Sequence, residues 1–220
     1  MFAVGHIALA YLLGWSSAKI LKVKTILPLI IVLSILPDAD LLLGIAHRGP
    51  THSLIMAIVI SVPFLIKYRK KALPYLIALL SHSLIADFFV GGHLQLLWPL
   101  SPNLYGFTPL YICITSLTNI ALETGLLIIA LLVMIKTQDI KQFFQKRLSN
   151  LLLAVPIITT LLPTFLAYPM TVPLLLVPGH LFYLVLFSIS AAISLPLFLK
   201  RIRDRSFASD RHTRLPDTHA

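Results

Sequence analysis

The sequence predicts an all-α, polytopic membrane protein with about seven transmembrane helices. Of its 220 residues, 58% are hydrophobic and only 12% are charged, and the mean hydropathy is +0.91. Soluble domains are about half apolar and about a quarter charged, so a soluble globular protein is excluded. The apolar runs are expected to be helices, because lipid offers no hydrogen-bond partners to the backbone of an open sheet.

Charges and Pro/Gly clusters divide the apolar residues into the expected crossings. These lie at residues 2–18, 25–43, 51–66, 72–90, 109–135, 149–167 and 174–199. A Tyr168-Pro169-Met170 turn separates the last two crossings. Together the crossings form one transmembrane domain, residues 1–199, and the basic segment 200–220 is expected to be a disordered cytoplasmic tail.

The basic residues lie on one side of the expected topology. Those within 19–24, 67–71, 136–147 and 200–205 follow the first, third, fifth and seventh crossings, and only Arg48 falls on the other side. The positive-inside rule therefore places the N-terminus outside and the tail in the cytoplasm. These topology signals beside anionic headgroups also explain the formal net charge of +10, so nucleic acid is not an expected partner.

Ionisable side chains inside the apolar crossings are the candidates for a functional site. Such groups are costly away from water unless they are paired or bind a metal. The expected topology brings the relevant side chains of the first four crossings to the outer membrane face, and Glu123 lies deeper in the fifth crossing. The residues at the outer face are His6, Asp38, Asp40, His47, Arg48, His52, His82 and Asp87.

The spacing of these residues departs from simple helical patterns. Asp38 and Asp40 are two apart and would point in opposed directions on a helix, so an extended segment after the preceding proline is expected to turn both inward. His82 and Asp87 are five apart and share a helix face only if the helix is distorted, for example by a π-bulge. Glu123 reaches the others only if the site extends towards the midplane or the fifth helix starts later than residue 109.

The residue types indicate a divalent metal. Cys113 is the only cysteine, which excludes an internal disulfide and a multi-cysteine zinc site. A mixed imidazole and carboxylate set suits Zn²⁺, or alternatively Mn²⁺, better than Ca²⁺. The expected metal ligands are His6, Asp38, Asp40, His52, Asp87 and Glu123.

The remaining polar residues of the cluster suit catalysis by such a metal. A bound metal activates water for hydrolysis. The planar guanidinium of Arg48 suits a phosphate or carboxylate group of a substrate. His47 and His82 are expected to transfer protons or to act as further ligands.

Simpler interpretations remain open for single residues. Asp38 can be a capping residue at a helix end, and Thr51 or Ser53 can cap the helix that follows Gly49-Pro50. His6 can be an interfacial histidine. These interpretations explain each residue alone, whereas the metal site explains why they occur together.

A set of motifs in this order resembles the YdjM-like family of inner-membrane proteins, over roughly residues 1–125. The resemblance implies a multi-pass protein of the cytoplasmic (inner) membrane with a metal-dependent hydrolase site. In the family pattern the histidine and aspartate of the fourth crossing are four residues apart, whereas here they are five apart. The motifs are Gly5-His6, Leu36-Pro37-Asp38-Ala39-Asp40, His47-Arg48-Gly49-Pro50-Thr51-His52-Ser53, Ser81-His82, Asp87 and Trp98-Pro99-Leu100-Ser101.

A looser similarity favours a phosphoester substrate. Zinc-dependent phospholipases C carry a His-X3-Glu element, and the corresponding residues here are Asn119 and Glu123, with asparagine in place of histidine.

Two functional hypotheses follow from the sequence. The first is a metal-dependent hydrolase that acts at the outer face on a lipid-linked or phosphoester substrate, with membrane lipids and an anionic, phosphate-containing molecule as partners. The alternative is a metal- or ion-binding membrane protein or transporter without hydrolysis. An ion path needs ionisable residues on both sides of the midplane. The sequence concentrates them in the outer half, which favours the enzyme.

Overall fold

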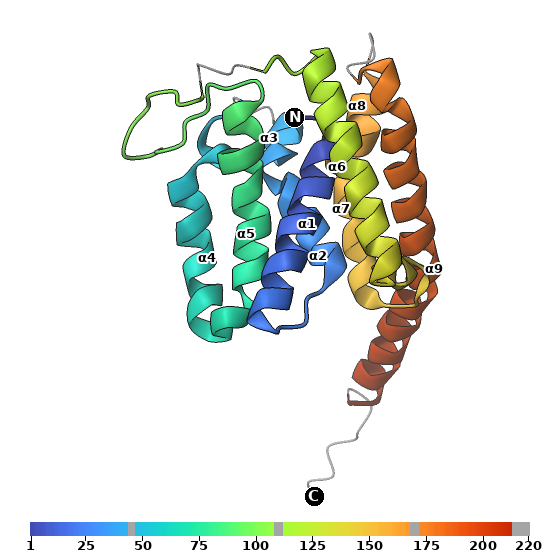
Figure 1. Ribbon diagram of the computed structural model, residues 1–220. Coiled ribbons are helices and arrows are strands. Elements are labelled where there is room, and N and C mark those ends of the chain that lie inside the picture. Colours follow the sequence, from blue (N-terminus) through green and yellow to red (C-terminus); the bar gives the residue numbers. More distant parts are fainter. Residues whose placement is uncertain (44–46, 108–111, 168–171, 213–220) are drawn as a thin grey trace, which may run out of the picture.

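The structure, a computed structural model, describes residues 1–43, 47–107, 112–167 and 172–212. Within these ranges the chain is mainly helical, and it contains no strand but two isolated β-bridges, between Val90 and Ile112 and between Leu94 and Tyr105. The predicted all-α class is confirmed. The helices run up and down a bundle (Figure 1).

Helix α1 (Ala3–Leu21) is at the centre of this bundle, packed against α2 (Leu27–Ile35), α5 (Leu73–Ser81) and α6 (Leu117–Lys136) (Figure 1). Small residues on α1 allow this close packing. A methyl group at Gly5 would meet the Glu123 side chain of α6 at 2.7 Å. A methyl group at Gly14 would meet Ile30 of α2 at 3.1 Å.

Short helical segments connect the longer helices at both ends of the bundle. After α2 the chain continues as a 3₁₀ turn, η1 (Leu36–Ala39), and as α3 (Asp40–Leu43). The next segments are η2 (Pro50–His52), α4 (Leu54–Tyr68), η3 (Arg69–Lys71) and α5. A π-helical segment, η4 (His82–Asp87), follows α5 directly.

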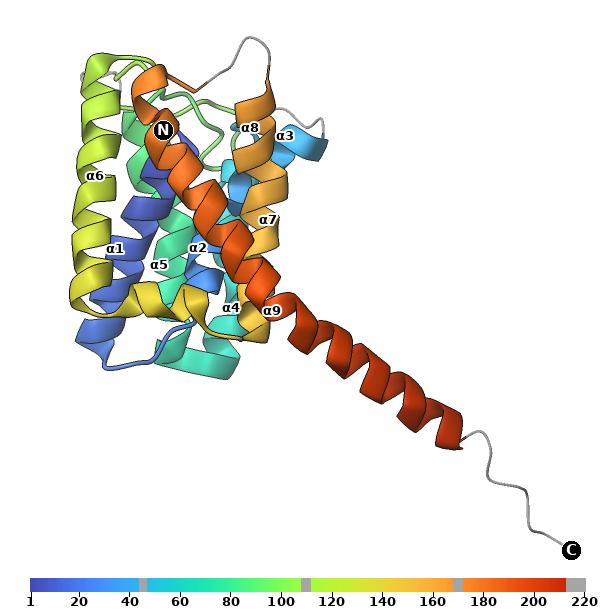
Figure 2. The same ribbon diagram turned by 90° about the vertical axis from the view of Figure 1, so that its right-hand side faces the viewer.

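The second half of the chain packs on the other flank of α1 (Figures 1 and 2). After α6 it forms η6 (Asp139–Phe144), η7 (Leu148–Leu153), α7 (Ala154–Pro156), η8 (Ile157–Leu161), α8 (Leu162–Leu166), η9 (Leu174–Leu176) and α9 (Val177–His212). The expected turn at Tyr168-Pro169-Met170 lies outside the described residues.

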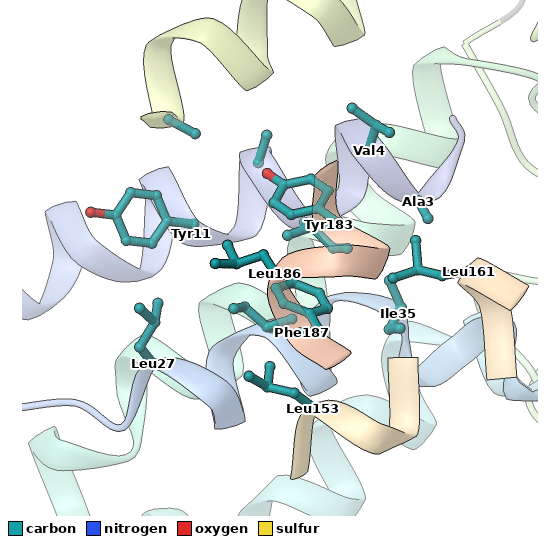
Figure 3. Packing of buried hydrophobic residues seen from close by; sticks show 14 of the residues in the cluster. Ala3, Val4, Tyr11, Leu27, Ile35, Leu153, Leu161, Tyr183, Leu186 and Phe187 are labelled. Atoms are coloured by element: carbon teal, nitrogen blue, oxygen red, sulfur yellow. The ribbon is translucent and has the colours of Figure 1, made fainter. Parts of the chain in front are cut away.

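The main apolar core joins the two halves of the bundle (Figure 3). Tyr11 of α1, Leu153 of η7, and Tyr183 and Phe187 of α9 are almost completely buried in it. The rings of Tyr183 and Phe187 stack with centroids 5.3 Å apart. This core packs against the first half of α1, from Ala3 to Tyr11. The polar residues described next lie at the N-terminal end of the same helix.

Four helical segments of the described residues are long and apolar enough to cross a membrane: Ala3–Leu21, Leu117–Lys136, Leu148–Leu166 and Leu174–Asp204. Leu73–Asp87 is apolar but shorter. The chain is therefore a multi-pass helical membrane protein, as predicted, while the count of seven crossings and the orientation remain predictions.

Two boundaries differ from those expected from the sequence. The fifth crossing was expected from residue 109, but α6 begins at Leu117, because the Ser116 hydroxyl caps it by accepting a hydrogen bond from the Asn119 amide. At the other end of the chain, α9 continues through residues 200–212, which were expected to be disordered (Figure 2). Arginine and lysine are good helix formers, which favours this continuation.

Candidate metal centre

Six side chains from different segments meet where α1 begins, α2 ends and α5 ends. We call this group the His/Asp centre. All six residues are less than a tenth exposed. They are His6 of α1, Asp38 of η1, Asp40 of α3, His52 of η2, and His82 and Asp87 of η4.

Two triangles of ligand atoms share one edge in the middle of the centre. That edge joins the Nε2 atoms of His52 and His82, which are 3.1 Å apart. Asp87 Oδ2 lies 3.3 Å from His52 Nε2 and 3.4 Å from His82 Nε2. Asp38 Oδ1 lies 3.5 Å and 3.3 Å from the same two nitrogens. A tetrahedral zinc ion with bonds of about 2.0–2.1 Å would hold its ligand atoms about 3.3–3.4 Å apart, so these distances fit such an ion.

Hydrogen bonds at the far side of each imidazole assign its proton. His82 Nδ1 lies 2.7 Å from the backbone carbonyl of Ser34 and must donate to it. The Thr51 hydroxyl donates its single hydrogen to Asp40 Oδ2 at 2.8 Å, so His52 Nδ1, 3.0 Å from the same hydroxyl, donates to Thr51.

In the neutral form with this tautomer, each of the two histidines turns a bare Nε2 lone pair towards the other and towards the carboxylates. A single proton would join only two of these nitrogen and oxygen atoms in a hydrogen bond, whereas one metal ion can accept a lone pair from each of them. Outer partners that fix the tautomer in this way are the rule for metal-binding histidines. His52, His82 and Asp87 also form one of the groups whose ligand atoms lie within 4.8 Å of one another.

Asp40 stands behind His52, away from the shared edge. Its Oδ1 accepts a hydrogen bond from His47 Nδ1 at 3.1 Å, and its Oδ2 lies 3.4 Å from His52 Nδ1. Asp38 and Asp40 thus approach opposite nitrogens of one imidazole. The extended segment expected here is wrong: the residues are helical, because a proline is tolerated in the first turn of η1. In a 3₁₀ turn of three residues, positions two apart are about 120° apart, which lets both reach His52.

The π-helical segment η4 brings His82 and Asp87 onto one face. Its i→i+5 pattern extends to Phe88, whose amide donates to the Ser83 carbonyl. The side chains five residues apart consequently meet at 3.4 Å. The condition stated from the sequence, that only a distorted helix aligns these residues, is met.

The second oxygen of Asp87 faces positively charged and donor groups. Asp87 Oδ1 lies 3.1 Å from the Met1 amino group, 3.5 Å from His6 Nε2 and 3.6 Å from an Arg48 guanidinium nitrogen. The guanidinium also donates to the Gly92 carbonyl at 2.8 Å. It lies so close to Gly91, whose φ is +79°, that a side chain there would clash with it.

His6 lies against the centre through its ring. It stacks on His82 with centroids 3.8 Å apart, and its Nε2 lies 3.1 Å from the Met1 carbonyl. Its Nδ1 is buried without a hydrogen-bond partner. His6, Asp38 and His82 form a second group of possible ligands within 4.8 Å, and Asp38, His47 and His52 form a third.

Glu123 is occupied by the start of α1. Its carboxylate accepts hydrogen bonds from the backbone amides of Phe2 at 2.8 Å and Gly5 at 3.0 Å, and from the Asn119 side chain at 2.8 Å. The N-cap residue of α1, Phe2, provides no side-chain cap, and Glu123 of α6 replaces it. Among the described residues Glu123 belongs to none of the three possible ligand groups.

A Glu123→Gln variant is expected to lose stability without losing the capacity of the His/Asp centre to bind a metal. Glutamine offers one acceptor oxygen to the three donors, and each buried donor without a partner costs about 1–3 kcal/mol. Thermal unfolding in detergent should therefore shift to lower temperature, while the metal content of the folded protein stays that of the wild type. Loss of metal from the correctly folded variant would instead support the assignment of Glu123 as a ligand made from the sequence.

Three partners in the centre carried no signal in the sequence. The Ser34 and Met1 groups that bind the histidines are backbone atoms, which any residue type provides. Thr51 was considered only as a helix cap, whereas Ser53 caps α4 by accepting from the Met56 amide at 3.3 Å. The position of Thr51 directly before His52 was the only clue in the sequence to the role of its hydroxyl.

The fold and the centre together define a class: multi-pass helical membrane proteins with a buried cluster of histidine and aspartate at one end of the bundle. A family model described as YdjM inner membrane protein matches residues 1–168, well beyond the 125 residues expected from the motifs. The chain belongs to this family and is a multi-pass protein of the inner membrane. Comparisons with curated proteins and with solved structures returned no match.

Proposed function

We propose that the protein is a metal-dependent hydrolase of the inner membrane that acts on a phosphoester. The observation that carries the proposal is the pair of Nε2 atoms of His52 and His82, 3.1 Å apart and flanked by two carboxylate oxygens. A divalent metal bound there acts as a Lewis acid on a phosphoryl oxygen and on water.

In the proposed centre the two imidazoles and Asp87 hold the metal, and Asp38 is the proton acceptor. Three protein ligands leave one position of a tetrahedral ion open, as in catalytic zinc sites. Asp38 is the most accessible member, with a tenth of its side chain exposed, against 2% or less for His52, His82 and Asp87. Its Oδ1 is therefore suited to take the proton of an attacking water.

The residues around this core are suited to binding and proton delivery. His47 is 40% exposed and hydrogen-bonded to Asp40, so its Nε2 can give a proton to a leaving group. Asp40 orients His47 and His52 together. The Arg48 guanidinium lies beside Asp87 and is suited to bind a phosphate.

We propose that the centre lies at the outer membrane face. The basic segments 19–24 and 69–71 lie at the opposite end of the bundle, after α1 and in η3 (Figure 1). The positive-inside rule assigns that end to the cytoplasm. The alternative function, ion transport, has less support, because the one deep carboxylate, Glu123, is fully bonded to α1 and Asn119.

The experiment that tests this function combines metal analysis with turnover. Protein purified in detergent without chelator should contain about one equivalent of Zn²⁺ or Mn²⁺ and should release phosphomonoester from model phosphodiesters or phosphate from model phosphomonoesters. A chelator should remove both metal and activity, and added metal should restore them. Protein that carries metal but hydrolyses no ester in a broad panel would favour the non-hydrolytic alternative.

An Arg48→Ala variant is expected to weaken substrate binding without loss of metal. Charge-assisted hydrogen bonds contribute about 1.5–3 kcal/mol each, so kcat/KM for an anionic phosphoester should fall by roughly 10- to 100-fold. Arg48→Lys should recover only part of this loss, because an ammonium cannot form the bidentate contact. An equal decline for a neutral carboxylic ester would show that Arg48 does not bind the phosphate.

A further inference from the structure

An apolar cavity of about 780 Å³ lies between α2, α4 and α5. Pro37, Pro50 and Thr51 line one end of it, and Lys24 and Lys71 line the other. Between these ends the walls are mostly aliphatic and aromatic, with Ser61 among them. They include Leu29, Leu33, Ile60, Phe64, Leu76 and Leu79.

The first end of the cavity adjoins the His/Asp centre. Pro37 precedes Asp38 in the chain, and Thr51 precedes His52. Thr51 both lines the cavity and donates its hydroxyl hydrogen to Asp40. A molecule that fills the cavity would therefore end within one residue of the proposed metal ligands.

The cavity opens sideways, towards the surroundings of α4. This helix has no buried residue, and Ile60 and Phe64, which line the cavity, are each 56% exposed. In a membrane those surroundings are lipid, so an apolar molecule can enter without crossing water. A cavity with such walls excludes charged peptides and free sugars, because their polar groups would find no hydrogen-bond partners.

The length of the cavity limits its occupant. Residues at both ends of α4 line it, from Met56 to Tyr68, and α4 with 15 residues is about 22 Å long. One leaflet contributes about 15 Å of the hydrocarbon core. An acyl chain matches this length, whereas a polyprenyl chain is several times longer than a leaflet is deep.

We propose that the cavity holds one acyl chain of an anionic glycerophospholipid, whose phosphate then lies at the His/Asp centre. The substrate class would be a membrane phospholipid. The assignment of this lipid as a substrate rests on the proposed hydrolase function. The binding of its chain in the cavity does not.

Photo-crosslinking tests the binding step directly. The probe is phosphatidylglycerol with a diazirine at the end of one acyl chain, in vesicles that contain the full-length protein. Crosslinks are expected on cavity residues far from the centre, such as Phe64, Leu65 and Tyr68, and should persist in metal-free protein. Labelling spread evenly around α4 would mean that only the surrounding bilayer is sampled, and would overturn the proposal.

Variants of α4 make the test specific. Ser61→Trp fills the middle of the cavity and should abolish most of the cavity crosslink, with the milder Ser61→Leu causing a partial loss. The matched control is Val62→Trp, because Val62 is the next residue, 42% exposed and outside the cavity lining, and it should label as the wild type does. Equal labelling of the Ser61 and Val62 variants would contradict the proposal.

Two further readouts separate this inference from the proposed function. A cavity crosslink in metal-loaded wild-type protein that hydrolyses no phosphoester would overturn the proposed function and leave the lipid site intact. Hydrolysis of soluble phosphodiesters without any cavity crosslink would overturn the lipid site and leave the proposed function intact. Polyprenyl phosphate that displaces the probe at lower concentration than unlabelled phosphatidylglycerol would overturn the choice of an acyl chain.

Discussion

Replacing His82 with alanine is expected to abolish metal binding and hydrolysis together. The imidazole provides one of the two Nε2 atoms on the shared edge, and the Ser34 carbonyl fixes its tautomer. Without it, two ligands remain, and the neighbouring carboxylates lose the cation that offsets their burial. Metal content per folded protein should fall to the background level. His93→Ala is the matched control, since His93 belongs to none of the three possible ligand groups and should retain full metal content.

Asp38→Asn should separate metal binding from catalysis. If Asp38 accepts the proton of the attacking water, the variant keeps its metal and loses roughly 10²- to 10⁴-fold in kcat, the usual contribution of a general base. A variant that loses the metal as well would make Asp38 a ligand, as the sequence analysis expects. Asp87→Asn should lose the metal in either case. Comparison of the two variants therefore shows whether Asp87 alone, or Asp38 as well, binds the metal together with His52 and His82.

Deleting Ile85 is expected to leave the metal bound, although it shortens the segment between two ligands. Ile85 is the most exposed residue of η4, at 44%, and the π-helical segment holds one residue more than an α-helix needs. Removal should convert η4 into regular α-helix with His82 and the aspartate four apart, which again places them on one face. This is the spacing expected for the family.

The opposite change should be far more harmful. Insertion of an alanine after Ile85 makes the spacing six and turns the aspartate away from His82, so metal affinity should fall by more than the roughly 100-fold caused by loss of an outer partner. Metal titration and thermal unfolding of both variants provide the measurement. Metal loss in the deletion and retention in the insertion would show that η4 does not set the alignment.

The sequence was sufficient to predict the gathering of polar residues but not their individual contacts. Alternation of the helices brings His6, Asp38, His52 and Asp87 to one end whatever the details of packing. Which atom of Asp40 faces which ring nitrogen depends on the rotation of η1 and α3, which the residue types alone do not determine.

Glu123 shows a different limit of the sequence. A buried carboxylate in an apolar helix can bind a metal or satisfy backbone amides, and the residue type is the same in both cases. Only the position of the first turn of α1, allowed by Gly5, shows that amides lie within reach. Likewise, helix boundaries such as the start of α6 depend on a local cap at Ser116 that competes with an uninterrupted apolar run.

Helix α4 offers a way to couple the two proposed binding events. His52 lies two residues before α4 begins, and α4 has no buried residue, so tertiary packing resists its displacement less than that of α1. An acyl chain that enters beside α4 and shifts it also shifts the imidazole. The factor by which the lipid changes the affinity for metal then equals the factor by which metal changes the affinity for lipid. If the lipid raises the affinity for the metal, the centre is completed most fully when a lipid is already in place.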